Sequence, residues 1–216
     1  MKKLLVALLG LAVAQSSIGQ EITLKGKELF GDLRARQIGP ALMSGRIIDL
    51  EGHPTNDRIV YVGSAGGGVW KSANGGASFQ PIFDEHCQSI GKVKLDPKNP
   101  DQVIWVGTGE IWTRNSVSVG DGLYKTTDGG QNWKKVGFEK SERISSIEIN
   151  PNNTKEMYVG VLGALWSDSD ERGVYKSVDG GQTWEKTLFV DGTTGCGDLI
   201  MDPNNPNVLY ASMWEF

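Results

Sequence analysis

The sequence predicts an all-β protein made of repeated four-stranded antiparallel units. Three observations lead to this prediction: an octet that occurs three times, a proline turn that occurs four times, and a composition with 29 glycines and seven tryptophans in 216 residues. Many short strands joined by tight turns have such a composition. The density of glycine and proline also argues against a solenoid of helices.

The octet has the form Ser/Thr-x-Asp-Gly-Gly-x-x-aromatic and predicts a tight turn between two strands. The Asp carboxylate accepts hydrogen bonds from amides of the turn, the glycines adopt positive φ, and the aromatic ring packs beneath the turn. We therefore assign a structural role to the first, third and eighth residues of the three copies. These residues are Ser72, Asn74, Phe79, Thr126, Asp128, Trp133, Ser177, Asp179 and Trp184.

A second marker alternates with the octets: an apolar strand, a turn rich in Pro and Asn, and another apolar strand. The marker prolines recur at intervals of 43, 54 and 52 residues and are Pro54, Pro97, Pro151 and Pro203. Such a period is typical of propellers and solenoids, and four-stranded units of this length are the blades of a β-propeller. In the second unit we expect strands A to D at 92–95, 103–107, 122–126 and 132–136.

The propeller is expected to span residues 33–216. Its blades are expected at about 44–83, 89–138 and 143–189, with a partial fourth blade at 197–216. Residues 33–39 resemble an isolated strand D, of the kind that completes the last blade of a closed propeller. Three blades and part of a fourth cannot close a ring. We therefore expect an incomplete ring, with further blades or domains downstream that are missing from this chain.

The first 19 residues are expected to form a secretory signal peptide, followed by a lead-in at 20–32. Lys2 and Lys3 precede an apolar run too short to span a bilayer, and small residues then allow cleavage after Ala14 or Gly19. The expected location is therefore secreted or periplasmic. No later segment is long and apolar enough to predict a membrane span.

The net charge, the cysteines and the histidines indicate which partners, disulfides and metal sites are not expected. The formal net charge of −4 argues against a nucleic-acid partner. Cys87 and Cys196 precede equivalent strands of different blades, so we expect them to be too far apart for a disulfide and to remain free thiols. His53 and His86 are too few and too scattered to predict a metal site. We expect no metal and no cofactor.

The loops between strands B and C are the most variable part of each unit and carry the candidate site. They share one face of the ring with the D–A crossovers, whereas the A–B turns and the octets share the opposite face. A tryptophan follows strand B in each of blades two to four, at Trp112, Trp166 and Trp214. Together with Arg114 and Asn115 these rings form a candidate platform for a glycan or peptide ligand.

The alternative for the three tryptophans is packing, because rings that recur at equivalent positions often fill the gaps between blades. Arg46 and Arg143 also occupy equivalent places, at the start of strand A, where they either bind a carboxylate or tie neighbouring blades together. Glu110 and Asp168 are the candidate catalytic carboxylates of these loops. The catalytic residues otherwise stay unknown at this level.

The motif Ser-x-Asp-x-Gly-x-x-Trp resembles the Asp-box, or bacterial neuraminidase repeat. Repeats of Val-Tyr-Lys-Ser-x-Asp-Gly-Gly-x-Thr-Trp, with Asp-Pro-x-Asn-Pro turns, are similar to sortilin-type propellers and to xyloglucan-hydrolysing endoglucanases over about residues 33–216. The resemblance implies an exported propeller. It also implies a position for one catalytic Asp of the xyloglucan hydrolases, in a Tyr-Ala-Arg-Thr-Asp-Ile-Gly-Gly-like run, and that position is Ala65 here.

Two interpretations of function follow, and whether the protein is an enzyme stays open. The first is a sortilin-like propeller that binds a peptide or glycan on its B–C loop face, and the sequence favours it. The second is a glycoside hydrolase that acts on a polysaccharide with a displaced carboxylate pair. An inverting mechanism needs an acid and a base about 6.5–9.5 Å apart, so Glu110 or Asp168 would have to replace the missing Asp. A third possibility is a scaffold for downstream domains.

Overall fold

The structure is a computed structural model that describes residues 46–215. The expected signal peptide at 1–19, the lead-in at 20–32 and the closing strand at 33–39 lie outside the described residues. The described part consists of strands, turns and loops only, which confirms the all-β prediction. No helix long and apolar enough to cross a membrane occurs among residues 46–215.

Three antiparallel sheets of four strands and one of two strands make up this part of the chain. The first sheet consists of β1 (Ile47–Gly52), β2 (Val60–Ser64), β3 (Gly68–Ser72) and β4 (Gln80–Pro81). The second consists of β5 (Ile90–Leu95), β6 (Ile104–Thr108), β7 (Leu123–Thr126) and β8 (Lys134–Lys135). The third consists of β9 (Ile144–Ile149), β10 (Met157–Val161), β11 (Gly173–Ser177) and β12 (Glu185–Leu188). The two-stranded sheet consists of β13 (Thr194–Met201) and β14 (Leu209–Glu215).

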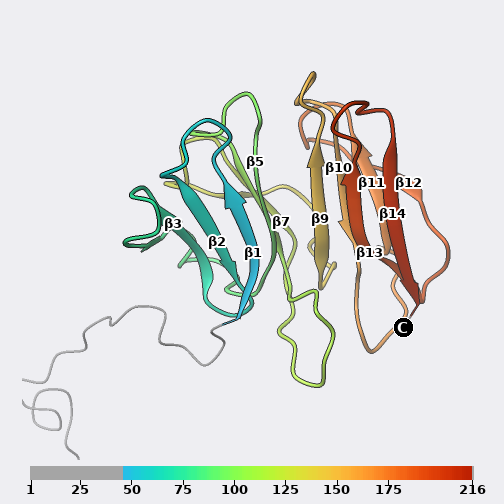
Figure 1. Ribbon diagram of the computed structural model, residues 1–216. Helices are drawn as coiled ribbons and strands as arrows, with labels where there is room; N and C mark the ends of the chain where they lie inside the picture. Colours follow the sequence, from blue (N-terminus) through green and yellow to red (C-terminus); the bar gives the residue numbers. More distant parts are fainter. Residues whose placement is uncertain (1–45, 216) are drawn as a thin grey trace, which may run out of the picture. The chain divides into compact units, whose positions relative to one another are not determined.

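These sheets are arranged as the blades of a β-propeller. Each sheet pairs its strands in chain order, and the first strands of successive sheets, β1, β5, β9 and β13, lie next to one another (Figure 1). The four strands expected in the second unit are all present, with bounds within two residues of the prediction. The predicted propeller of four-stranded antiparallel blades is therefore confirmed for three complete blades and part of a fourth.

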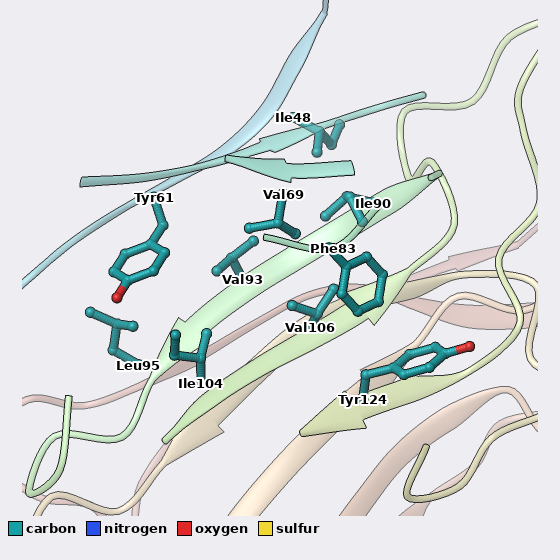
Figure 2. Packing of buried hydrophobic residues seen from close by; sticks show 10 residues of the cluster. All are labelled: Ile48, Tyr61, Val69, Phe83, Ile90, Val93, Leu95, Ile104, Val106 and Tyr124. Atoms are coloured by element: carbon teal, nitrogen blue, oxygen red, sulfur yellow. The ribbon is translucent and has the colours of Figure 1, made fainter. Parts of the chain in front are cut away.

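The hydrophobic core lies between neighbouring blades. Figure 2 shows Tyr61 and Val69 of the first blade packed with Ile90 and Val93 of the second. A second cluster joins the second blade to the third, with Trp105 and Leu123 against Ile144 and Ile147. Each blade therefore covers the apolar face of the next, as expected for stacked sheets.

The octets form the predicted turns. In the second copy the hydroxyl of Thr126 donates a 2.6 Å hydrogen bond to Asp128, whose carboxylate also accepts the amide of Asn132 at 2.9 Å. Gly129 and Gly130 have φ of 73° and 96°, a region that favours glycine. These hydrogen bonds, that from Thr126 above all, lower the pKa of Asp128 to about 2.

Each octet lies beside the A–B turn of its own blade, as the sequence predicts. The first glycine of the octet donates a backbone hydrogen bond to a carbonyl just before the second strand in all three copies. The pairs are Gly75 with Arg58 at 2.8 Å, Gly129 with Gln102 at 3.0 Å and Gly180 with Lys155 at 2.9 Å. These two sets of turns therefore share one face of the propeller.

Both cysteines are free thiols, as expected. Burial raises the pKa of Cys87 and raises that of Cys196 to about 12. A buried thiol with a raised pKa holds little thiolate at neutral pH and is therefore a poor nucleophile.

Candidate functional site: a tryptophan-lined groove

A groove of about 530 Å³ opens over the first strands of the four blades. The strands β1, β5, β9 and β13 contribute Ile48, Asp49, Gly91, Lys92, Ser145, Gly197 and Asp198. The segments that follow β6 and β10, together with β14, contribute Ile111, Trp112, Thr113, Leu162, Ser212 and Trp214. The groove is therefore built by residues from all four blades and includes part of the B–C loop face that the sequence singled out.

Small residues of the inner strands line this groove. Gly91, Ser145 and Gly197 occupy the position six residues before the marker proline of their blades. A Cβ atom at Gly91 would lie 2.2 Å from the carbonyl oxygen of Ile144. The backbones of neighbouring blades approach each other too closely there for any residue except glycine.

The three candidate tryptophans do not share one platform. Trp112 and Trp214 both line the groove and are 59% and 57% exposed. Trp166 is 78% exposed but does not belong to the lining. All three residues are more than half exposed in the part of the chain that the structure describes.

Trp214 differs from its expected setting in one respect. The sequence placed it in a loop after strand B, whereas β14 extends to Glu215 and pairs Trp214 with Gly195 of β13. The alternating arrangement of side chains on a strand therefore determines which way this ring points.

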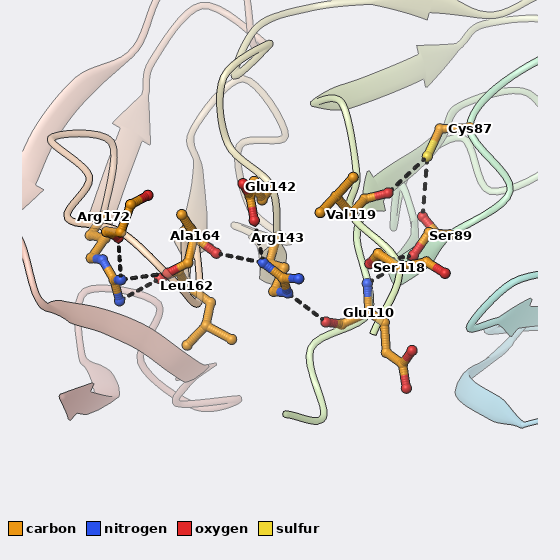
Figure 3. A network of polar contacts seen from close by, with 12 residues as sticks. Cys87, Ser89, Glu110, Ser118, Val119, Glu142, Arg143, Leu162, Ala164 and Arg172 are labelled. Atoms are coloured by element: carbon orange, nitrogen blue, oxygen red, sulfur yellow. Dashed lines mark hydrogen bonds and ion pairs between the residues drawn. The ribbon is translucent and has the colours of Figure 1, made fainter. Parts of the chain in front are cut away.

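Glu110, one of the two candidate acids, is buried and ion-paired. Its carboxylate is 1% exposed and contacts the guanidinium groups of Arg46 and Arg114, the latter at 3.4 Å. Its backbone carbonyl accepts a 3.1 Å hydrogen bond from Arg143 Nε (Figure 3). Glu110 does not line the groove. Arg46 and Arg143 therefore tie neighbouring blades together, and Arg46 does so by binding a carboxylate, so both predicted roles are met at Arg46.

Asp168, the other candidate acid, is exposed in the loop between β10 and β11 and lies outside the groove lining. Its loop is fixed at both sides: Ser169 donates its amide to the carbonyl of Gly192 at 2.9 Å, and Arg172 donates to the carbonyl of Leu162 at 3.3 Å. The structure does not bring Asp168 and Glu110 together in one site. Asn115 is likewise exposed and outside the lining.

The carboxylates that line the groove are Asp49 and Asp198, which sequence reasoning missed. Asp49 accepts hydrogen bonds of 2.8 Å from Lys92 Nζ and from the amide of Val93 in the next blade. Asp198 is exposed and accepts a 3.0 Å hydrogen bond from the Ser146 hydroxyl. Both acids stand five residues before a marker proline, so the repeat spacing was the signal that could have identified them.

Lys92 occupies the same repeat position as these two acids. Its burial lowers the pKa of the ammonium group, but the hydrogen bond and the charge of Asp49 outweigh this effect, and the pKa is raised. The charged groups in the groove lining are thus one neutralised pair, Asp49 with Lys92, and the carboxylate of Asp198.

A second hollow of about 260 Å³ lies on the face of the A–B turns and is lined by all four marker prolines. Glu51, Lys94 and Glu148 also line it. Burial raises the pKa of both glutamates, and the nearby charge of Lys94 counters part of this rise. No group of three or more His, Cys, Asp or Glu side chains among residues 46–215 is arranged to hold a metal ion.

Comparison with known proteins agrees with this architecture. Residues 124–135 and 175–186 match the BNR/Asp-box repeat. The structure aligns with that of an ancestral GH74 enzyme, with a TM-score of 0.63 and 24% identity over 83% of this chain and 23% of the other. The GH74 xyloglucanase from Xanthomonas campestris gives a TM-score of 0.58 and 22% identity over 76% of this chain and 26% of the other. This chain is an Asp-box β-propeller.

Two curated relatives of the Asp-box propeller carry the name xyloglucanase. The xyloglucanase of Hypocrea jecorina is 26% identical over 72% of this chain and 19% of its own length. Xyloglucanase Xgh74A of Acetivibrio thermocellus is 26% identical over 76% of this chain and 19% of its own length. The propeller thus spans about a fifth of the length of these relatives, and it is glycoside hydrolase-like in its similarities.

Proposed function

We propose that this propeller belongs to a polysaccharide-acting protein of the glycoside hydrolase type and that its groove binds a segment of the polysaccharide. The observation that carries the proposal is that two half-exposed tryptophans, Trp112 and Trp214, line the same groove as the carboxylate of Asp198. Aromatic rings stack on the apolar faces of sugars, and a carboxylate accepts hydrogen bonds from sugar hydroxyls.

The similarity to xyloglucanases supports the second of the two functions considered from the sequence. The sortilin-like interpretation, which the sequence favoured, has no comparable support. Xyloglucan is therefore the first ligand to test, with other β-glucans beside it. On the sequence of residues 1–19 we also propose that the protein is exported.

Hydrolysis here would need a different carboxylate from the one that the resemblance implies, because Ala65 stands at the position of the catalytic Asp of the xyloglucan hydrolases. Ala65 is 1% exposed, and its amide donates a 3.1 Å hydrogen bond to the carbonyl of Arg46. A methyl group at this place supplies neither acid nor base. Of the two groove carboxylates, Asp49 is paired with Lys92, so we propose Asp198 as the carboxylate that contacts the glycan.

Binding is tested by isothermal titration calorimetry of the protein with xyloglucan oligosaccharides. Trp112→Ala and Trp214→Ala should each weaken binding about tenfold, equal to about 1.4 kcal/mol. Trp166→Ala is the matched control, because it removes an exposed ring that lies outside the groove, and it should leave the affinity unchanged. If the wild-type protein binds no β-glucan, or if all three variants bind alike, the proposal is wrong.

Release of reducing ends from xyloglucan tests turnover in the same samples. Asp198→Asn keeps the shape of the side chain and removes its charge. Loss of product with retained binding would assign Asp198 to catalysis, whereas loss of both would assign it to binding. Product formation at the wild-type rate would exclude Asp198 from the reaction.

A further inference from the structure

We propose that Glu110 is a positioning residue that holds Trp112 in the groove by connecting three blades, and that it is not a catalytic acid. The expected effect of Glu110 on ligand binding rests on the proposed function. The position of Trp112 itself can be measured without any ligand.

The carboxylate of Glu110 contacts two arginines, one that precedes it in the sequence and one that follows it. Arg46 precedes β1 of the first blade, and Arg114 lies four residues after Glu110 in the same loop. Both guanidinium groups contact the same oxygen, Oε1. With 1% exposure, this carboxylate is separated from any ligand in the groove. A buried acid in two ion pairs is costly to disturb, because removal of its charge leaves the partner charges uncompensated.

The backbone of Glu110 is fixed as well. Its amide donates to the Ser89 hydroxyl at 3.0 Å and to the carbonyl of Ser118 at 3.1 Å. Its carbonyl accepts the 3.1 Å hydrogen bond from Arg143, which precedes β9 of the third blade, and Arg143 also contacts the carboxylate of Glu142 (Figure 3). Glu110 therefore joins side-chain or backbone groups of the first, second and third blades.

Trp112 lies between two anchored residues. Ile111 packs against the hydrophobic cluster between the first two blades. Arg114 returns to Glu110, so the ion pair closes a five-residue loop whose tip is Trp112 and Thr113. Both tip residues line the groove. An exposed ring on a loop closed in this way is held in place before a ligand arrives, which lowers the ordering cost of binding.

The test follows the environment of Trp112 by fluorine NMR of protein labelled with 5-fluorotryptophan, without ligand. Trp112→Phe assigns its resonance among those of the seven tryptophans. Glu110→Gln should shift the Trp112 resonance or split it into several lines and leave the Trp166 resonance unchanged. Arg114→Gln breaks the same loop closure from its exposed end and serves if Glu110→Gln does not fold. Arg114→Lys keeps a cation there and should restore the wild-type resonance.

Asp168→Asn is the matched control, because it removes the charge of the other candidate acid from the equivalent loop. It should leave the Trp112 resonance unchanged. Affinity for xyloglucan oligosaccharides is then measured by calorimetry, and it should fall about tenfold in Glu110→Gln and in Arg114→Gln. An unchanged Trp112 resonance in both variants would overturn the proposal.

Two further outcomes separate this inference from the proposed function. If the wild-type protein binds no glycan but Glu110→Gln still moves the Trp112 resonance, the positioning role stands and the ligand is wrong. If Glu110→Gln abolishes turnover with wild-type affinity and a wild-type Trp112 resonance, Glu110 acts in the chemistry and the inference is wrong.

Discussion

The indole N–H of Trp133 donates a 2.7 Å hydrogen bond to the carbonyl of Ile82, just after the last strand of the preceding blade. Trp184 repeats this contact at 3.2 Å with Val136. The aromatic residue of each of these octets thus bonds to a neighbouring blade, in addition to packing near its own turn. Phe79 takes the same place in the first octet, has no N–H group and is 40% exposed.

Trp133→Phe should therefore destabilise the protein more than its small change in volume suggests. The phenyl ring would keep only part of the packing, and the carbonyl of Ile82 would also lose its donor, at a cost of about 1–3 kcal/mol. Urea unfolding followed by circular dichroism measures the difference. Trp166→Phe, at an exposed ring, should stay within about 0.5 kcal/mol of the wild type. Equal stabilities of the two variants would contradict this role.

Asn74→Asp should raise the stability at neutral pH. Asn74 accepts the amide of Ser78 at 2.9 Å and donates its side-chain amide to the Ser78 hydroxyl. In the third octet the matching hydroxyl of Thr183 instead donates to Asp179 at 2.6 Å, and an ionised acceptor makes the stronger bond. The midpoint of urea unfolding should increase. Asn115→Asp adds the same charge outside the octets and should not increase it.

The octet acids should also make stability depend on pH in acid. The pKa of Asp128 is lowered from 3.8 to about 2 in the folded protein. The carboxylate therefore contributes stability above pH 3.8, and this contribution is lost as the pH falls through about 2. The difference in unfolding midpoint between the wild type and Asp128→Asn should shrink over this range. A difference that stays constant with pH would show that ionisation of Asp128 does not matter.

Lys94 should stabilise the proline-lined hollow mainly above pH 4.5. Burial raises the pKa of Glu51 and of Glu148 above the usual 4.5. The positive charge of Lys94 offsets part of this rise, and both pKa values remain raised. Lys94→Met should raise these pKa values further, so the variant loses more stability than the wild type as the pH rises above 4.5. Thermal unfolding at pH 4 and pH 7 measures the gap, which should be wider at pH 7. Lys98→Met, at an exposed turn, should show no such change.

Ile147 and Leu50 occupy the same repeat position, four residues before the marker proline, but differ in burial. Ile147 is fully buried between blades, whereas Leu50 is 61% exposed. Ile147→Ala should cost about 2–5 kcal/mol, and Leu50→Ala less than about 0.5 kcal/mol. Urea unfolding of both variants checks this. A large loss at Leu50 would mean that another part of the protein covers this face of β1.

The repeats made most of the fold predictable from sequence. The Asp128 and Asp179 octets and the proline turns determine where strands begin and end, because these local motifs satisfy their own hydrogen bonds. The candidate site was less predictable. Glu110 looked like a free acid of a variable loop, and its partner Arg46 is 64 residues away. Such a pairing depends on which strands become neighbours, and no local motif encodes it.

The groove carboxylates illustrate the same limit. Asp49 and Asp198 lie in different blades, and only the shared register of the repeats places both in one lining. Trp112 and Trp166 follow equivalent strands, yet only Trp112 lines the groove. The two loops differ in their contacts: in the third blade Arg172 donates hydrogen bonds to the carbonyls of Leu162 and Ala164.

The location of the apolar clusters between blades has a consequence for how this protein folds. A single sheet would expose both of its apolar faces, so one blade alone is not a stable cooperative unit. Stability then grows with each pair of adjacent blades, in the manner of a one-dimensional chain with nearest-neighbour coupling. A destabilising substitution at one interface between blades should lower the stability of the two blades that form it and of little else. Local unfolding should begin at the blade that has the fewest faces covered by other blades.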